Sequence, residues 1–157
     1  MKPSVTDGDL LDQDVDVIVN PWNRNLIPWW LLLPQGVSGA IKRRAGLTPF
    51  RELRRLGLIP LGGAVETSAG RLPFRAIIHV AGINLCWRTS ERAIRDCVVN
   101  ALDLARQRRY QSIAFPLIGT GTGGFPSERA LQLMLEAARQ TDYEWEVRIV
   151  RFRSVAK

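Results

Sequence analysis

A glycine-rich segment near the carboxyl end constrains the fold of this chain more than any other feature. This segment, the glycine loop, spans residues 116–126 and contains four glycines: Gly119, Gly121, Gly123 and Gly124. An apolar run at 112–115 precedes it, and a helix is expected to begin near Ser127. Backbone with little Cβ bulk can fold back so that several N–H groups point at one spot, and a helix N-terminus beside such a turn attracts anions. The glycine loop therefore indicates a phosphate-bearing small ligand held between a strand and a helix.

Two familiar phosphate-binding motifs do not account for the glycine loop. The spacing of Gly119, Gly121 and Gly124 matches the dinucleotide-binding fingerprint, and Glu144 lies about where its ribose-binding acid is sought. That match fails on context, because too little chain follows to build two mononucleotide-binding halves. A P-loop is excluded because no Lys-Ser or Lys-Thr follows the last glycine. A purely structural turn between strand and helix stays an open alternative.

Apolar periodicity alternates between strands and helices along the chain. Strands are expected at 15–19, 64–68, 76–81, 112–115 and 147–152, and helices at 39–44, 50–56, 90–108 and 127–139. This alternation predicts an α/β fold with a mixed, mostly parallel sheet covered by helices on both faces. The length of 157 residues predicts a single domain over residues 1–157. Ligands of such sheets bind outside the carboxyl ends of the strands, so the segments after residues 19 and 115 carry the candidate site.

The charge of the chain favours an anionic partner. The formal net charge is +7 and the pI about 10.4, and most of the positive charge is arginine. Such a balance suits a phosphorylated ligand or a nucleic acid. No recognised nucleic-acid motif accompanies the arginines, so nucleic-acid binding is the less favoured alternative.

The apolar segments, the cysteines and the single histidine indicate where the protein is located and which kinds of site it can form. The most apolar segment, residues 26–33, is far shorter than the roughly 20 residues of a membrane-spanning helix. The cysteines Cys86 and Cys97 are too few for a disulfide framework, and the N-terminus has no apolar leader, so a cytoplasmic location is expected. One histidine and two cysteines argue against a zinc site of the usual kind, so no metal is expected. His79 lies between apolar residues, which favours a half-buried strand position over a catalytic base.

Six segments in order along nearly the whole chain resemble the macro domain, the ADP-ribose-binding module. They are Gly8-Asp9-Leu10, Val17-Ile18-Val19-Asn20 with Asn23, Gly36-Val37 with Gly39-Ala40-Ile41, Leu61-Gly62-Gly63-Ala64, Leu72-Pro73 with Ile77-Ile78-His79, and the run from Ser112 into the glycine loop. The glycine loop itself most resembles that of the macro module of a histone variant. The resemblance implies a three-layer α/β/α fold that binds ADP-ribose or a derivative without a metal or cofactor.

The resemblance also implies how each end of the ligand would be held. Asp9 would accept the exocyclic amine of adenine, and Asn23 would bond the distal ribose hydroxyls, although either side chain could instead satisfy a turn backbone. The first turn of a helix and the glycine loop would clasp the diphosphate from two sides. The ligand-binding residues so implied are Asp9, Leu10, Asn20, Asn23, Gly36, Val37, Ser38, Gly119, Thr120, Gly121, Thr122, Gly123, Gly124 and Phe125. Phe125 would wall the ribose or adenine, or belong to the core.

Departures from the family pattern leave catalysis open. One type of ADP-ribosyl hydrolase in the family carries an Asp where this chain has Ser38. A second type uses a strand Lys and a loop Asp, whose approximate matches here are Ser68 and Gly123. Both standard catalytic sets are therefore expected to be absent, which leaves Asn23 as a candidate catalytic residue. The family's glycine run before Gly36 is replaced as well, and the loop from Asn23 to Gly36 is longer.

Three functions follow from these residues. The leading prediction is a reader or sensor of ADP-ribose or an ADP-ribose conjugate. The alternative is an enzyme acting on the distal ribose, either an ADP-ribosyl hydrolase or a phosphatase or deacetylase, with ADP-ribose 1″-phosphate, O-acetyl-ADP-ribose or ADP-ribosylated protein as substrate. The second alternative is nucleic-acid binding through the arginines. The apolar insert Trp29-Trp30-Leu31-Leu32-Leu33 would wall the distal ribose through Trp29 or Trp30, pack on the domain, or mediate self-association.

Overall fold

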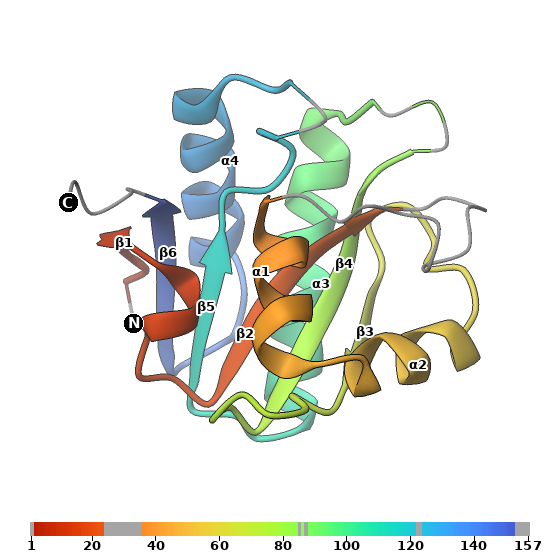
Figure 1. Cartoon of the computed structure of the whole chain (residues 1–157). Coiled ribbons are helices and arrows are strands. Elements are labelled where there is room, and N and C mark those ends of the chain that lie inside the picture. The colour runs from red at the N-terminus through yellow and green to blue at the C-terminus, as the bar shows by residue number, and fades with distance from the viewer. Residues whose placement is uncertain (1, 24–35, 85, 87, 122–123, 153–157) are drawn as a thin grey trace, which may run out of the picture.

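The computed structural model describes residues 2–23, 36–84, 86, 88–121 and 124–152. Its elements, in chain order, are β1 (Ser4–Gly8), the short 3-10 helix η1 (Leu10–Asp12), β2 (Val17–Asn23), α1 (Gly36–Ala45), α2 (Thr48–Arg55), β3 (Ala64–Thr67), β4 (Ala76–Ile83), α3 (Glu91–Gln107), β5 (Ser112–Pro116), α4 (Ser127–Arg139) and β6 (Glu146–Phe152). The strands form a sheet in the order β1-β6-β5-β2-β4-β3 (Figure 1).

The sheet is parallel except at one edge. β1 pairs with β6, β6 with β5, β5 with β2, and β2 with β4, all in parallel, whereas β3 runs antiparallel to β4. The carboxyl ends of the five parallel strands therefore lie at one end of the sheet (Figure 1). This arrangement brings the carboxyl end of β2 beside that of β5, from which the glycine loop follows.

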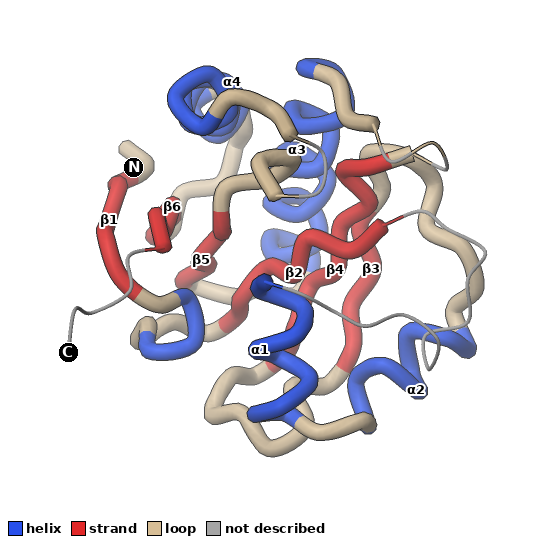
Figure 2. The backbone as a smooth tube through the Cα atoms, turned by 45° about the horizontal axis from the view of Figure 1, so that its top comes forward, coloured by secondary structure: helices blue, strands red, loops and turns tan. Residues whose placement is uncertain are grey.

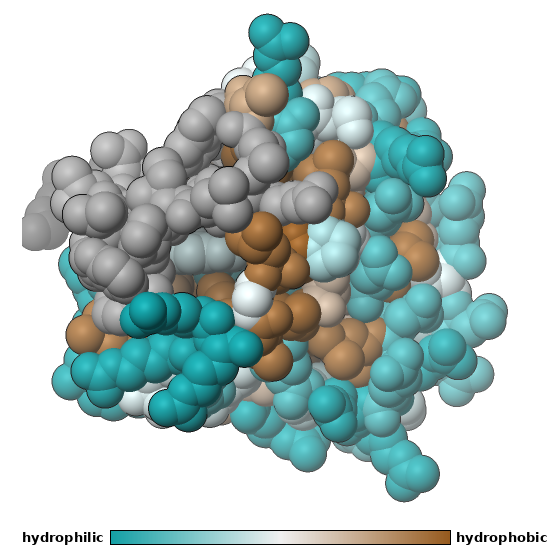
Figure 3. All heavy atoms as spheres, turned by 90° about the vertical axis from the view of Figure 1, so that its right-hand side faces the viewer, coloured by the Kyte–Doolittle hydropathy of each residue, from teal (hydrophilic) through white to brown (hydrophobic). Residues whose placement is uncertain are grey.

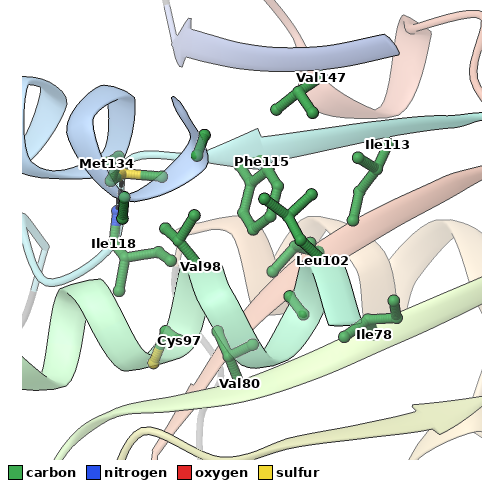
Figure 4. Close-up of a cluster of buried hydrophobic side chains, with 14 of the residues drawn as sticks. Ile78, Val80, Cys97, Val98, Leu102, Ile113, Phe115, Ile118, Met134 and Val147 are labelled. Atoms are coloured by element: carbon green, nitrogen blue, oxygen red, sulfur yellow. Dashed lines mark hydrogen bonds between the residues drawn. The ribbon is translucent and has the colours of Figure 1, made fainter. Parts of the chain in front are cut away.

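Helices cover both faces of the sheet, which confirms the three-layer α/β/α fold. α3 and α4 lie on one face and α1 and α2 on the other (Figure 2). On the first face, Val98 and Leu102 of α3 pack with Phe115 of β5 and Met134 of α4 (Figure 4). β4 is buried along its whole length, because a strand between two helical layers has apolar neighbours on both sides.

Several element boundaries differ from those expected from the sequence. β2 begins at Val17 and continues through Pro21 to Asn23, where a strand over 15–19 was expected. β5 pairs with β2 only at Val17 and Ile18, so the nitrogen of Pro21 has no ladder bond to β5 to lose. α1 likewise begins three residues earlier than expected, at Gly36.

β1 was not expected from the sequence at all. Its residues are mostly exposed or half-buried, so the strand has no buried apolar alternation that a sequence pattern could reveal. It is held in place by parallel pairing with β6, from Ser4 beside Arg148 to Gly8 beside Phe152. Its position therefore depends on a contact between the two ends of the chain.

The side of the molecule that carries α2 and β3 combines apolar and basic residues. Figure 3 shows apolar side chains gathered there between hydrophilic ones. Leu56 and Leu58, which follow α2, are about half exposed, and the arginines of α2 also face solvent: Arg51, Arg54 and Arg55. Part of the arginine charge is thus dispersed over the outer surface of α2.

Gly70, in the turn between β3 and β4, provides a test of the packing under α1. A Cβ there would collide with the carbonyl oxygen of Ala45, and the φ of +58° favours glycine. Gly57 has a similar φ of +78° but nothing within 4 Å of a Cβ, so Gly57→Ala is a matched control for backbone strain alone. We expect Gly70→Ala to unfold in urea with a free energy lower than that of Gly57→Ala by about 1–3 kcal/mol. Equal free energies would contradict the close approach.

Candidate functional site

A cleft of about 360 Å³ lies at the carboxyl end of the sheet, a volume in the range of small-molecule sites. Its lining comes from the first turn of α1, the end of β5, the glycine loop, the start of α4 and the end of β6: Val37, Pro116, Leu117, Thr120, Ser127, Val150, Arg151 and Phe152. Two helix N-termini therefore border the cleft. Their first N–H groups lack intrahelical partners and carry partial positive charge, which suits an anion.

The glycine loop closes on itself through two backbone hydrogen bonds. The Phe125 N–H donates to the Gly119 carbonyl and the Gly124 N–H to the Gly121 carbonyl, both at 3.0 Å. Gly119 and Gly124 have φ of +82° and +62°, so both need glycine for the turn itself. Phe125 also packs partly against the core between the sheet and α3 and α4, which supports its structural role.

Gly119 and Gly121 play different parts in the glycine loop. A Cβ at Gly119 would lie 3.0 Å from Thr89 Cγ2, so this glycine also allows close packing on the segment before α3. A Cβ at Gly121 would meet nothing within 4 Å, and the residue is exposed. Folding therefore places no steric demand on Gly121, and the open space beside it is available to a ligand.

The first turn of α1 faces the cleft from the opposite side. Gly36 has a φ of +61° and is exposed, and Val37 lines the cleft. Ser38, which is half-buried, donates its hydroxyl to Asn20 Oδ1 of β2 at 2.7 Å. The turn that was expected to hold a diphosphate is thus anchored to the sheet through Ser38.

Asp9 and Phe152 lie near each other at the β1–β6 edge. Gly8 and Phe152 are register partners, and Asp9 follows Gly8 directly. Asp9 Oδ1 accepts the Leu11 N–H at 2.8 Å as the cap of η1, and Leu10 beside it is buried. The Phe152 side chain is 74% exposed and lines the cleft. Phe152 was not among the expected site residues, although an aromatic residue ending a strand at the ligand-binding end of the sheet is a usable signal.

Arg151 and Ser127 are further cleft residues that the sequence analysis did not single out. Arg151 lines the cleft while its Nε donates to Asp7 Oδ1 at 2.8 Å. Ser127 is the first residue of α4 and lies at the N-terminus that faces the cleft. Arg151 and Ser127 reach the cleft because β6 and α4 meet beside the glycine loop. No local sequence pattern predicts that contact.

Asn20 and His79 lie side by side in the sheet, and the burial of His79 corrects one expectation. Neither has exposed surface, and they are register partners on β2 and β4, with Asn20 Nδ2 and His79 Nδ1 3.0 Å apart. His79 Nε2 lies 2.8 Å from Thr67 Oγ1 on β3. The side chain of Asn20 therefore joins Ser38 to His79, and its expected contact with the ligand stays a prediction. His79 is fully buried where a half-buried position was expected. Burial lowers the pKa of His79 to about 3, so its ring is neutral at pH 7.

Ser68, the approximate match for one missing catalytic group, lies away from the cleft. It follows β3, whose antiparallel direction places Thr67 beside Ile77, near the start of β4. Its N–H and hydroxyl both donate to the carboxylate of Glu52 on α2, at 2.7 and 2.6 Å. Ser68 thus joins β3 to α2 and takes no part in the site.

Some of the expected site residues lie outside the described part of the chain. They are Trp29, Trp30 and the rest of the apolar insert, together with Thr122 and Gly123. Asn23 is described as backbone only: it ends β2 opposite Ile83, after a register shift that follows Trp22. Among the described residues, no cluster of three or more His, Cys, Asp or Glu could hold a metal ion. No helix of the described ranges is long and apolar enough to cross a membrane.

Comparison with known proteins identifies the family of this fold. The family called Macro domain matches residues 19–134. The chain belongs to the macro domain family. It is 38% identical to a macro domain-containing protein of Listeria monocytogenes over 97% of this chain and 89% of that protein.

Two further relatives carry names that bear on function. The macro domain is 41% identical to a protein of Escherichia fergusonii named O-acetyl-ADP-ribose deacetylase, over 84% of this chain and 75% of that one. It also resembles the Trypanosoma brucei macrodomain solved in complex with ADP-ribose, with a TM-score of 0.81 and 25% identity, over 96% of this chain and 63% of that one.

The buried His79 predicts how stability depends on pH. Its folded pKa of about 3 lies below the usual 6.5, so the unfolded chain binds the proton first. The free energy of unfolding is therefore highest above pH 6.5 and decreases as the pH falls toward 3, by about 2 kcal/mol between pH 7 and pH 5. Urea denaturation at pH 7 and pH 5 measures this loss, and His79→Gln should reduce it. Because the chain has one histidine, an imidazole proton resonance titrating near pH 6.5 in the folded protein would contradict the prediction.

Proposed function

We propose that this macro domain binds ADP-ribose or an ADP-ribose conjugate as a reader or sensor. The observation that carries the proposal is the cleft bordered by two helix N-termini and the glycine loop. A structurally similar member of the family, from Trypanosoma brucei, was solved in complex with ADP-ribose. The cleft suits a ligand with an anionic centre and an aromatic end.

The centre of the cleft fits a diphosphate. The first turn of α1 approaches it through Val37 and the start of α4 through Ser127, so partial positive charge reaches it from two sides. Thr120 of the glycine loop lines it as well, and Gly121 beside Thr120 leaves room for close approach to the backbone. Arg151 adds a formal positive charge to the lining.

The β1–β6 edge fits a purine. The exposed ring of Phe152 offers a flat apolar face on which a base can stack. The cap of η1 engages Asp9 Oδ1, and a carboxylate has a second oxygen that can accept the amine of adenine. Adenine at this edge and a diphosphate at the glycine loop would direct the distal ribose toward the end of β2.

The distal ribose end carries the finer predictions. Asn23 as the partner of the ribose hydroxyls and Trp29 or Trp30 as a wall beside the ribose stay predictions. Self-association through the apolar insert and a cytoplasmic location also stay predictions. Nucleic-acid binding is less favoured because, in the described part of the chain, Arg151 is the one arginine lining the cleft, while those of α2 lie on its outer surface.

The alternative is hydrolysis at the distal ribose, favoured by relatives named O-acetyl-ADP-ribose deacetylase. The described residues that line the cleft include no carboxylate, histidine or cysteine, which supports binding over turnover. Turnover would need a water held by the ligand phosphate and Asn23.

Incubation with O-acetyl-ADP-ribose tests this alternative. We expect the protein to hydrolyse O-acetyl-ADP-ribose no faster than buffer alone, as measured by chromatography of the remaining substrate. Accumulation of ADP-ribose in proportion to the protein added would establish the alternative.

Gly121→Glu tests the diphosphate site without disturbing the fold. The new side chain would enter open space in the apo protein but would place a negative charge against the diphosphate, and like charges in contact are strongly unfavourable. We expect ADP-ribose affinity, measured by calorimetry, to fall at least tenfold, or about 1.4 kcal/mol.

Gln107→Glu is the matched control. Gln107 is exposed at the far end of α3, so this variant makes the same change in net charge at the opposite end of the sheet. It should bind ADP-ribose as the wild type does. If Gly121→Glu keeps wild-type affinity, the glycine loop is only structural. If both variants weaken equally, long-range charge is responsible.

A further inference from the structure

We infer that Ser38 selects the group attached to the diphosphate, because a buried chain of side chains leaves its hydroxyl able only to accept a hydrogen bond from the ligand. Ser38 would therefore favour a group with a free hydroxyl, such as unmodified ribose, over one esterified or phosphorylated at that position. This inference rests on the proposed function, since it concerns the ligand of the same site.

The chain of hydrogen bonds starts at Thr67 on β3. Its hydroxyl lies 3.0 Å from the Ser68 carbonyl oxygen, which can only accept, so the one hydroxyl proton is donated there. Toward His79 Nε2, at 2.8 Å, Thr67 Oγ1 must then act as the acceptor. The proton between these two atoms therefore belongs to His79 Nε2.

The tautomer of His79 determines which atom of the Asn20 amide faces the ring. The ring has no exposed surface, and burial lowers its pKa to about 3, so it carries a single ring proton at pH 7. With that proton on Nε2, Nδ1 has a bare lone pair and accepts from Asn20 Nδ2 at 3.0 Å. The orientation of the Asn20 amide follows from the tautomer of His79.

Asn20 in turn determines what Ser38 can do. With Nδ2 toward His79, Asn20 presents Oδ1 to Ser38 and accepts its hydroxyl proton at 2.7 Å. A serine hydroxyl has one proton and two lone pairs, so Ser38 keeps only acceptor capacity for other partners. It is half-buried in the first turn of α1, directly after the cleft residue Val37.

The hydrogen-bond chain from Thr67 to Asn20 is shielded from water. Asn20, His79 and Thr67 lie on three adjacent strands, β2, β4 and β3, and are 0%, 0% and 4% exposed. The ring of Phe50 on α2 packs edge-on against His79, with ring centroids 6.2 Å apart, and the centroid of Trp22 lies 5.6 Å from that of Phe50. Reversing the hydrogen-bond chain would take the Thr67 proton away from the Ser68 carbonyl oxygen, which would then lose this hydrogen bond.

The chemical consequence is selection by the proton that the ligand offers. A ribose hydroxyl over Ser38 can donate, so both atoms are satisfied. An ester oxygen or an ionised phosphate oxygen has no proton to donate and would set lone pairs against lone pairs. Ser38 thereby distinguishes a free hydroxyl from a modified one without carrying any charge.

The tautomer of His79 tests the direction of the chain without any ligand. In tag-free protein labelled with ¹⁵N, the one histidine gives a single pair of ring nitrogen signals in a long-range ¹H–¹⁵N correlation spectrum. A neutral ring protonated at Nε2 is expected at pH 7. Protonation at Nδ1 would reverse every donor and acceptor as far as Ser38 and would overturn the inference.

Ligand affinities test the selection itself. Ser38→Ala should weaken ADP-ribose about 2- to 12-fold, the value of one hydrogen bond, and leave AMP unchanged. Analogues of ADP-ribose lacking one distal hydroxyl identify the partner, because one of them should bind the wild type and Ser38→Ala equally. Thr67→Val, which removes the start of the chain, should weaken ADP-ribose but not AMP, and Thr67→Ser should restore it. Circular dichroism and melting temperature establish that each variant is folded.

The failures can be told apart. If wild-type protein binds ADP-ribose and Ser38→Ala binds it equally well, or loses AMP in the same proportion, the selective role of Ser38 is overturned and the proposed function stands. If wild-type protein does not bind ADP-ribose, the proposed function fails and this inference fails with it, whatever the tautomer of His79.

Discussion

The parallel pairing of β2 with β4 is the constraint on which the rest of the structure depends. It joins Val17–Asn23 to Ala76–Ile83 over seven register pairs, deep between the two helical layers. β5 pairs with the other side of β2, so the ends of both strands open into the same region. The glycine loop and the first turn of α1 face each other across the cleft because β5 and β2, the strands that precede them, lie side by side.

The site uses backbone charge more than side-chain charge. The chain carries a formal charge of +7, yet the described part of the cleft has one arginine in its lining, and that arginine is paired with Asp7. The remaining attraction for an anion comes from the N-termini of α1 and α4 and from the backbone of the glycine loop. Such a site suits recognition of a diphosphate, and the described residues of its lining include no carboxylate, histidine or cysteine.

Some residues of the cleft region are needed for folding, some are free to contact a ligand, and some do both. Gly119 has a positive φ and packs closely against Thr89, whereas a Cβ at Gly121 would contact nothing within 4 Å. Asp9 uses one carboxylate oxygen to cap η1. The buried Asn20, His79 and Thr67 stabilise the contact between three strands and at the same time control the hydroxyl of Ser38. A buried polar chain of this kind specifies a single arrangement because each of its members needs its neighbour.

The sequence by itself determined the layers, most elements and the position of the glycine loop. α3, α4 and β4 were predictable because apolar periodicity is local, and Gly119 because a positive φ favours glycine. Only the tertiary structure decided the rest. β1, the extension of β2 through Pro21, and the cleft positions of Arg151 and Phe152 depend on strands paired across long stretches of chain. The contact between Asn20 and His79 joins residues 59 positions apart, and no local pattern encodes which buried polar atoms meet.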